Sequence, residues 1–117
     1  MNLETYQRLA ARTLNDDEEP RMQLAIYGLG LAGEAGEVVE AIKKHVGHGH
    51  NLDTEKLEKE LGDVLWYLAA IATRNGISMT NVAEVNIKKL MKRYPDGFSS
   101  ERSVNRDEST SGRTEGS

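Results

Sequence analysis

Two pairs of acidic residues, each with a spacing of three, are the part of this sequence best suited to chemistry. Glu34 and Glu37 form one pair, and Glu60 and Asp63 form the other. A helix advances about 100° per residue, so each pair would make one acidic edge, with its members about 60° apart on neighbouring turns. Carboxylates gathered in one place raise one another's pKa unless cations neutralise them. Hard divalent cations that prefer oxygen ligands, Mg²⁺ above all, are the natural partners of such a group.

Apolar stripes beside both acidic pairs predict that the carboxylates lie at the border of a buried core. Each stripe begins about 20° from the first acid of its pair and spans roughly a third of the helix circumference. If the stripes pack against each other as two arms of a helical hairpin, the four carboxylates meet at one edge of the interface. The stripes are Leu24, Tyr27, Leu31, Ala35, Val38, Ile42 and Val46, and then Leu57, Leu61, Val64, Leu65, Leu68, Ile71 and Ala72.

Length and composition indicate one small domain without disulfides. The chain has 117 residues, two prolines, no cysteine and a formal net charge of -4. It therefore offers no thiol nucleophile and lacks the basic excess of a general nucleic-acid binder. It also has no apolar run long enough to span a bilayer and no apolar signal core at its start. We expect a cytoplasmic protein that binds neither membrane nor nucleic acid.

Helical periodicity and capping residues predict an all-α fold of four helices. The domain should cover residues 1–95, and residues 96–117 should form a flexible tail, because their composition is polar and ends in ESTSGRTEGS. Asn75 and Gly76 should end the third helix, and Pro95 prevents a long continuation of the fourth. The expected helices are residues 2–14, residues 21–46, a third from a cap at Asp53 or Thr54 to Arg74, and a fourth from a cap at Ser78 or Thr80 to Arg93.

A glycine pattern in the second predicted helix allows a different interpretation. Gly28-x-Gly30-x-x-Gly33, with Asp53 further on, matches the dinucleotide-binding fingerprint if the residues before it form a strand. The residues before Asp53, HVGHGHNL, are not a second buried strand, and the rest of the chain is helical, so we favour the helix. Because each helical glycine costs nearly 1 kcal/mol, Gly28, Gly30, Gly33 and Gly36 then indicate the close approach of another helix or a ligand.

The motifs GEAGEVVE and EKELGDVLWYL, followed by NIKKLMKRYPDGFS, resemble the MazG-like members of the all-α nucleoside triphosphate pyrophosphohydrolases. The resemblance covers about Tyr6 to Ser99. It implies hydrolysis of a nucleoside or deoxynucleoside triphosphate between the α and β phosphates, giving the monophosphate and pyrophosphate, to control or clean the nucleotide pool. Many members have a glutamate directly before the first metal ligand, where this chain has Gly33, so any role of that glutamate as a base falls here to another residue.

The resemblance also implies a role for each acidic residue. Glu34, Glu37, Glu60 and Asp63 resemble the family's Mg²⁺ ligands, which would hold two or more ions, with Mn²⁺ as a possible substitute. Glu34 or Glu37 could serve as the general base through a carboxylate oxygen that is not bound to metal, and we favour Glu37. If each carboxylate is considered separately, the alternative is that it forms a salt bridge on the surface of its helix.

Four further residues resemble the family's substrate contacts: Tyr67, Asn86, Lys89 and Arg93. The last three share one helix face at i, i+3 and i+7, where the two cations could neutralise phosphate charge. Cations in late helical turns also complement the helix dipole, and Tyr67 could simply fill the core.

Self-association is expected, because so thin a protomer cannot bury both apolar stripes. Family members are dimers or tetramers, and we expect a homotetramer built from two dimers, or else a homodimer, with Trp66 at an interface.

Purine triphosphates such as dGTP are the slightly favoured substrates. Arg102 and Arg106 of the tail would fold over bound phosphates, while the histidines could line the nucleotide pocket or bind a transition metal. The alternative function is a catalytically silent helical interaction module. The histidines are His45, His48 and His50.

Overall fold

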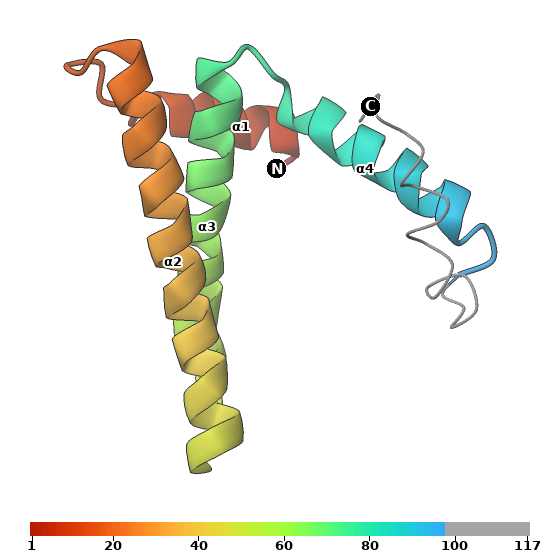
Figure 1. The fold of residues 1–117 in the computed structure, drawn as a ribbon. Helices are drawn as coiled ribbons and strands as arrows, with labels where there is room; N and C mark the ends of the chain where they lie inside the picture. Colours follow the sequence, from red (N-terminus) through yellow and green to blue (C-terminus); the bar gives the residue numbers. More distant parts are fainter. Residues whose placement is uncertain (98–117) are drawn as a thin grey trace. The chain divides into compact units, whose positions relative to one another are not determined.

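The computed structural model describes residues 1–97, and its regular structure is entirely helical. The described part of the chain has no strand, so the predicted all-α fold with four helices is confirmed (Figure 1). The segment that the dinucleotide-binding interpretation would begin with a strand is helical throughout. The helices are α1 (Leu3–Ala11), α2 (Pro20–His48), α3 (Thr54–Arg74) and α4 (Met79–Arg93).

Capping groups fix the helix ends close to the predicted positions. Asp53 caps α3 by accepting a hydrogen bond of 3.1 Å from the Lys56 amide, and Gly76 follows the end of that helix with a φ of 67°. At the start of α2, the Glu19 side chain accepts from the Met22 amide at 2.7 Å, so the helix begins one residue earlier than predicted. Gly49, with a φ of 70°, ends α2 two residues later than predicted.

The first helix is shorter than predicted, ending at Ala11 rather than at residue 14. The amides of Arg12, Thr13 and Leu14 donate to the carbonyls three residues before them, and the Thr13 hydroxyl also donates to the Ala10 carbonyl at 2.7 Å. This tight last turn satisfies the free carbonyls and closes the helix.

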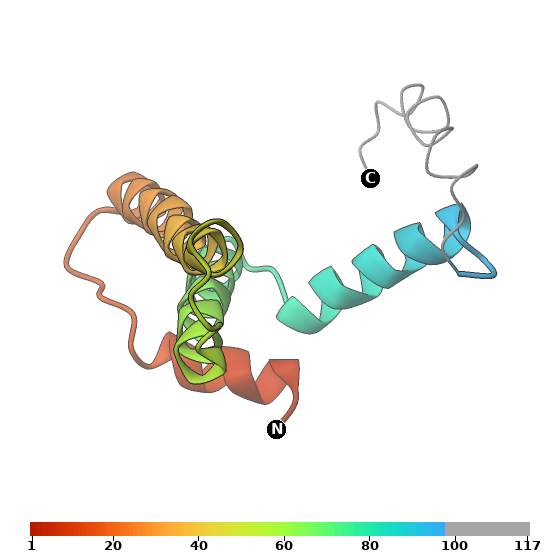
Figure 2. The ribbon, with the colours of Figure 1, turned by 90° about the horizontal axis from the view of Figure 1, so that it is seen from below.

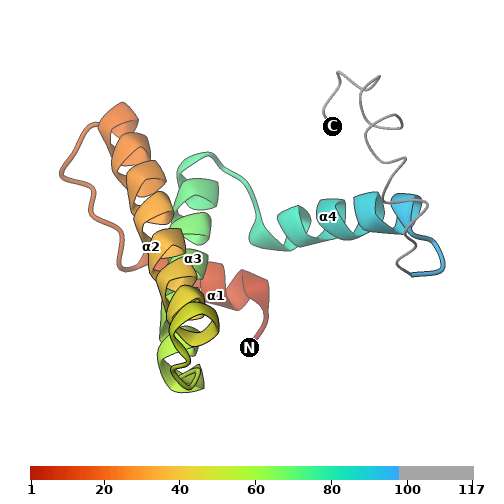
Figure 3. The same cartoon turned by 60° about the horizontal axis from the view of Figure 1, so that its bottom comes forward.

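The chain divides into two compact units, Met1–Met79 and Thr80–Ser117. In the first unit α2 and α3 form an antiparallel hairpin, and α3 lies between α2 and α1 (Figures 2 and 3). The described part of the second unit, residues 80–97, is mostly α4. The predicted domain of residues 1–95 and tail of residues 96–117 stay predictions, and residues 98–117 lie outside the described residues.

The core of the first unit lies at the end of the hairpin nearest α1. Ala69 is only 1% exposed, and together with Ala72 and Met79 it packs against side chains from α1. The opposite end of the hairpin is open, since Val46 is 76% exposed and Leu61 is 51% exposed. The predicted stripes are therefore buried only where α1 also packs.

Gln7 of α1 ties the core to the turn after α3. Its Nε2 donates to the Thr73 hydroxyl at 3.1 Å and to the Ile77 carbonyl at 2.8 Å, while its Oε1 accepts from the Met79 amide at 2.8 Å. One amide side chain thus satisfies polar groups on both sides of the turn.

Candidate metal centre

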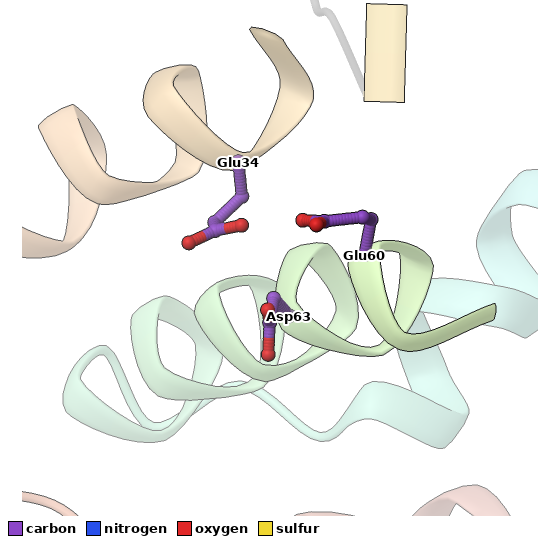
Figure 4. A group of neighbouring side chains, drawn as sticks. All are labelled: Glu34, Glu60 and Asp63. Atoms are coloured by element: carbon purple, nitrogen blue, oxygen red, sulfur yellow. The ribbon is translucent and has the colours of Figure 1, made fainter. Parts of the chain in front are cut away.

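The hairpin brings acidic residues from both of its helices together. Glu34 comes from α2, and Glu60 and Asp63 come from α3; one carboxylate oxygen from each lies within 4.8 Å of the others. Figure 4 shows the Glu34 side chain directed across the helix interface towards the other two. Glu34 and Glu60 are half-buried, whereas Asp63 is exposed. The cluster is thus partly shielded from water and partly open to it.

The surroundings of Glu34 raise its pKa above the usual range for a glutamate. Partial burial is the largest cause, followed by the negative charges of Asp63 and Glu60. A hydrogen bond with Glu60, which favours the protonated form, and the charge of Glu37 add to the shift. A cation bound among these carboxylates would relieve this repulsion.

Glu37, the fourth predicted ligand, lies outside the group of three. It is exposed and sits one turn after Glu34 on α2, and its charge still acts on the pKa of Glu34. Glu37 therefore lies beside the group of three carboxylates and not within it.

The family model of the MazG nucleotide pyrophosphohydrolase domain matches residues 24–98 of this chain. This range includes all four carboxylates. The chain belongs to the MazG family. It is also 35% identical over 78 residues to the Gene 37 protein of Mycobacterium phage L5, an alignment that covers 63% of this chain and 68% of the phage protein. No solved structure matches the chain. Membership indicates a nucleotide pyrophosphohydrolase.

The donor set of this MazG domain fits a hard divalent cation. Three carboxylates from two helices offer only hard oxygen ligands, the type that Mg²⁺ and Mn²⁺ prefer. The raised pKa of Glu34 agrees with that geometry, since the negative charges of Asp63 and Glu60 add to the effect of burial on its carboxyl group.

Tyr67 packs directly against α2, one turn beyond Asp63. A Cβ atom built on Gly30 would lie only 2.2 Å from the Tyr67 ring, so the ring occupies space that any other residue at position 30 would fill. Nothing lies within 4 Å of such an atom at Gly28, Gly33 or Gly36. Among the described residues, the predicted close approach is therefore found at Gly30 alone.

Trp66 supports this contact from the other side. Its ring meets Tyr67 edge to face at a centroid distance of 5.1 Å and Tyr27 at 5.8 Å, and its Nε1 donates to the Thr13 hydroxyl at 2.7 Å. The aromatic group of Tyr27, Trp66 and Tyr67 thus holds the two helices together beside the acidic cluster. The ring of Trp66 makes these contacts within the first unit, and its place at an interface between copies stays a prediction.

Nothing in the sequence indicated that Tyr6 of α1 is affected by the acidic cluster. Burial, and after it the negative charge of Asp63, raise the pKa of the Tyr6 phenol. The electrostatic field of the acidic cluster thus reaches α1. Tyr6 and Asp63 are far apart in the sequence, so no local pattern could have predicted this effect.

The remaining predicted substrate residues, Asn86, Lys89 and Arg93, lie on α4 in the second unit. Asn86 and Lys89 are exposed and Arg93 is half-buried. Their spacing of three and then four residues along α4 keeps them on one face of that helix, as predicted.

The His48 and His50 rings meet edge to face with their centroids 6.3 Å apart, and His45 Nδ1 lies 2.8 Å from the His50 carbonyl oxygen. Within the part of the chain that the structure describes, these histidines form no metal-binding group with one another or with acidic residues. No helix in the described residues is long and apolar enough to cross a membrane.

Proposed function

We propose that this MazG-family chain hydrolyses a nucleoside or deoxynucleoside triphosphate between its α and β phosphates, in a reaction that requires Mg²⁺. The observation that carries the proposal is the meeting of Glu34 with Glu60 and Asp63 across the α2–α3 hairpin. These three residues would hold the metal, with Glu37 completing the set from the rim. When bound, two or more Mg²⁺ ions, or Mn²⁺ in their place, would neutralise phosphate charge and lower the pKa of a water molecule.

Glu37 is the proposed general base. A carboxylate that is exposed and next to the cluster can accept a proton from water while Glu34, Glu60 and Asp63 stay in place. Glu34 is the second candidate, because its raised pKa brings it closer to the neutral range in which a base works best.

Tyr67, Asn86, Lys89 and Arg93 are the proposed substrate-binding residues. Tyr67 is held between Gly30 and Trp66, so its orientation beside the cluster is fixed before substrate binds. The exposed amide of Asn86 can bind a sugar hydroxyl, and the cations of Lys89 and Arg93 can bind phosphate oxygens.

The biological role that follows is to control or clean the triphosphate pool of the cytoplasm, with purines such as dGTP favoured. The homo-oligomer expected from the sequence belongs to the same proposal. It is supported by large apolar side chains that are exposed on α2 and α3.

A substrate panel tests the proposed reaction. The protein is incubated with each common and oxidised nucleoside triphosphate in Mg²⁺, and the products are separated by ion-exchange chromatography. We expect monophosphate and pyrophosphate in equal amounts, and none with EDTA. Diphosphate and orthophosphate would show that the wrong bond was assigned, and no turnover of any substrate would favour the silent interaction module.

Two neighbouring lysines test the substrate contacts. Lys89→Ala should raise KM about tenfold or more, because a phosphate contact is lost. Lys88→Ala removes an equally exposed charge about 100° away round α4 and should leave KM within about twofold. Equal effects of the two variants would show that only general charge matters.

A further inference from the structure

The Thr13 hydroxyl, in the segment between α1 and α2, binds the indole ring of Trp66. We call this segment, residues 12–19, the strap. Trp66 Nε1 donates to the Thr13 hydroxyl at 2.7 Å, and the hydroxyl donates its own proton to the Ala10 carbonyl, also at 2.7 Å. Because the second bond uses the hydroxyl proton, a lone pair of the oxygen is left for the indole N–H. The hydroxyl is therefore an acceptor whose direction is set by the last turn of α1.

Trp66 is the link between the strap and Tyr67. The rings of these two neighbours meet edge to face with their centroids 5.1 Å apart, and the ring of Tyr27 on α2 meets the same indole at 5.8 Å. An indole packed against two rings has few side-chain conformations open to it. The hydrogen bond to Thr13 selects among them, since a ring turned over about its χ2 angle would lose its acceptor.

Gly30 forms the other wall for the Tyr67 ring. A Cβ atom built on Gly30 would lie 2.2 Å from Tyr67 Cε1 and 2.8 Å from the Tyr67 hydroxyl oxygen, so the ring crosses α2 at this point. Gly30 is one turn before Glu34, a member of the acidic cluster. The place of Tyr67 beside the cluster thus depends on Trp66 keeping its own place.

We propose that Thr13 is a positioning residue of the proposed active site, which acts on the bound triphosphate through Trp66 and Tyr67. This inference rests on the proposed function, in which Tyr67 contacts the substrate. Thr13 is exposed and is not a member of the acidic cluster, so it has no part in holding the metal. Side chains that lock the conformation of a binding residue keep it near its productive position before the substrate arrives.

Two other contacts of the strap separate this role from simple attachment of the segment. Asp16 forms an ion pair with Arg74, and the Glu18 carbonyl accepts from Gln23 Nε2 at 2.7 Å. Gln23 is only 7% exposed, so this second contact is well protected from water. Neither contact involves an aromatic ring. Loosening the strap at Asp16 should therefore leave the indole of Trp66 where it is.

Kinetics of the full chain test the proposal. Valine has nearly the shape of threonine but cannot accept a hydrogen bond, so Thr13→Val should raise KM for the triphosphate about fivefold or more and keep kcat within about twofold. Thr13→Ser keeps the hydroxyl, and Asp16→Asn loosens only the strap; both should keep KM within about twofold. An unchanged KM in Thr13→Val, or an equal rise in Asp16→Asn, would overturn the proposal.

Two controls show whether Thr13 acts through Tyr67. In a chain that already carries Tyr67→Ala, adding Thr13→Val should raise KM no further, because the contact that it disturbs is gone. Mn²⁺ affinity should be the same in Thr13→Val as in the wild type, since the carboxylates are untouched. Additive effects on KM, or weaker Mn²⁺ binding, would show that the substitution disturbs the hairpin as a whole and would overturn the proposal.

Aromatic NMR tests the positioning of Tyr67 without any turnover. The ring current of Trp66, the one tryptophan in the chain, shifts the ring protons of Tyr67. These resonances should move in Thr13→Val and stay in place in Thr13→Ser and Asp16→Asn. If the wild type hydrolyses no triphosphate, the proposed function fails; unmoved Tyr67 resonances in Thr13→Val would overturn the positioning itself. Circular dichroism verifies folding, and Thr13→Ala, which also lacks the hydroxyl, repeats both measurements if the valine variant does not fold.

Discussion

The two ends of the α2–α3 hairpin bury apolar surface in different ways. At the end next to α1, Tyr27, Gly30, Trp66 and Tyr67 interlock and the alanines of α3 are buried. At the other end Ile42, Val46 and Leu61 of the same two stripes remain exposed. The acidic cluster lies between them, so the packed end fixes the helix separation at the site. The open end leaves surface for assembly.

The largest effect expected from this arrangement is on catalysis. Asp63→Asn keeps the size of the side chain but removes the charge, and we expect kcat/KM to fall at least about 10³-fold with helix content unchanged. Glu37→Gln should have a similar effect if Glu37 is the base.

Glu40 supplies the control, because it is an exposed carboxylate three residues after Glu37 on α2 and is not a member of the cluster. Glu40→Gln should keep kcat/KM within about twofold. Near-normal turnover in Asp63→Asn would show that the ligands were misassigned.

The next largest effect is on stability at the packed end. Gly30→Ala places a methyl group against the Tyr67 ring, which the aromatic neighbours of that ring hold in place, so unfolding free energy should fall by about 1–3 kcal/mol. Gly33→Ala on the same helix has open space and should gain about 0.5–1 kcal/mol from helix propensity. Urea unfolding measures both, and stabilisation by Gly30→Ala would show that Tyr67 does not set the helix separation.

Metal binding should stabilise the fold, and more so at higher pH. Folding raises the pKa of Glu34, so the folded protein binds more protons than the unfolded chain, and its metal-free stability falls as pH rises through that window. Mg²⁺ relieves this repulsion, and at ten times its dissociation constant it adds about 1.4 kcal/mol. The Mg²⁺-induced rise in Tm should therefore be larger at pH 7 than at pH 5, and a rise that is independent of pH would contradict the role of Glu34.

The smallest effect concerns the hydrogen bond from Trp66 to Thr13. Trp66→Phe and Thr13→Ala should each cost about 1 kcal/mol or slightly more, and the double variant should cost less than their sum by about 0.5–1.5 kcal/mol. If urea unfolding shows that the double variant loses as much unfolding free energy as the two single variants together, the bond does not hold the segment before α2 to the packed end.

The sequence predicted the helices well because the signals for them are local. Periodicity places Glu34 and Glu37 on one edge, and Asp53 and Gly76 mark helix ends by their own backbone preferences. The meeting of Glu34 with Glu60 and Asp63 followed from one further assumption, that the two stripes pack as a hairpin.

What the sequence could not give depends on contacts between distant segments. The four glycines of α2 look alike in sequence, and only the position of the Tyr67 ring separates Gly30 from the others. The two stripes are equally apolar along their length, so nothing local shows that Val46 is exposed while Tyr27 is buried. Tyr27 is buried where the ring of Trp66 on α3 packs against it, and no local pattern reveals that contact.

The central claim is that Glu34, Glu60 and Asp63 together bind a divalent metal, and direct titration tests it without substrate. Mn²⁺ binding, followed by the loss of the free-ion signal in electron paramagnetic resonance, should saturate in the wild-type protein and be displaced by Mg²⁺. It should weaken at least about tenfold in Asp63→Asn but not in Glu40→Gln. Equal Mn²⁺ affinity in all three proteins would contradict the account.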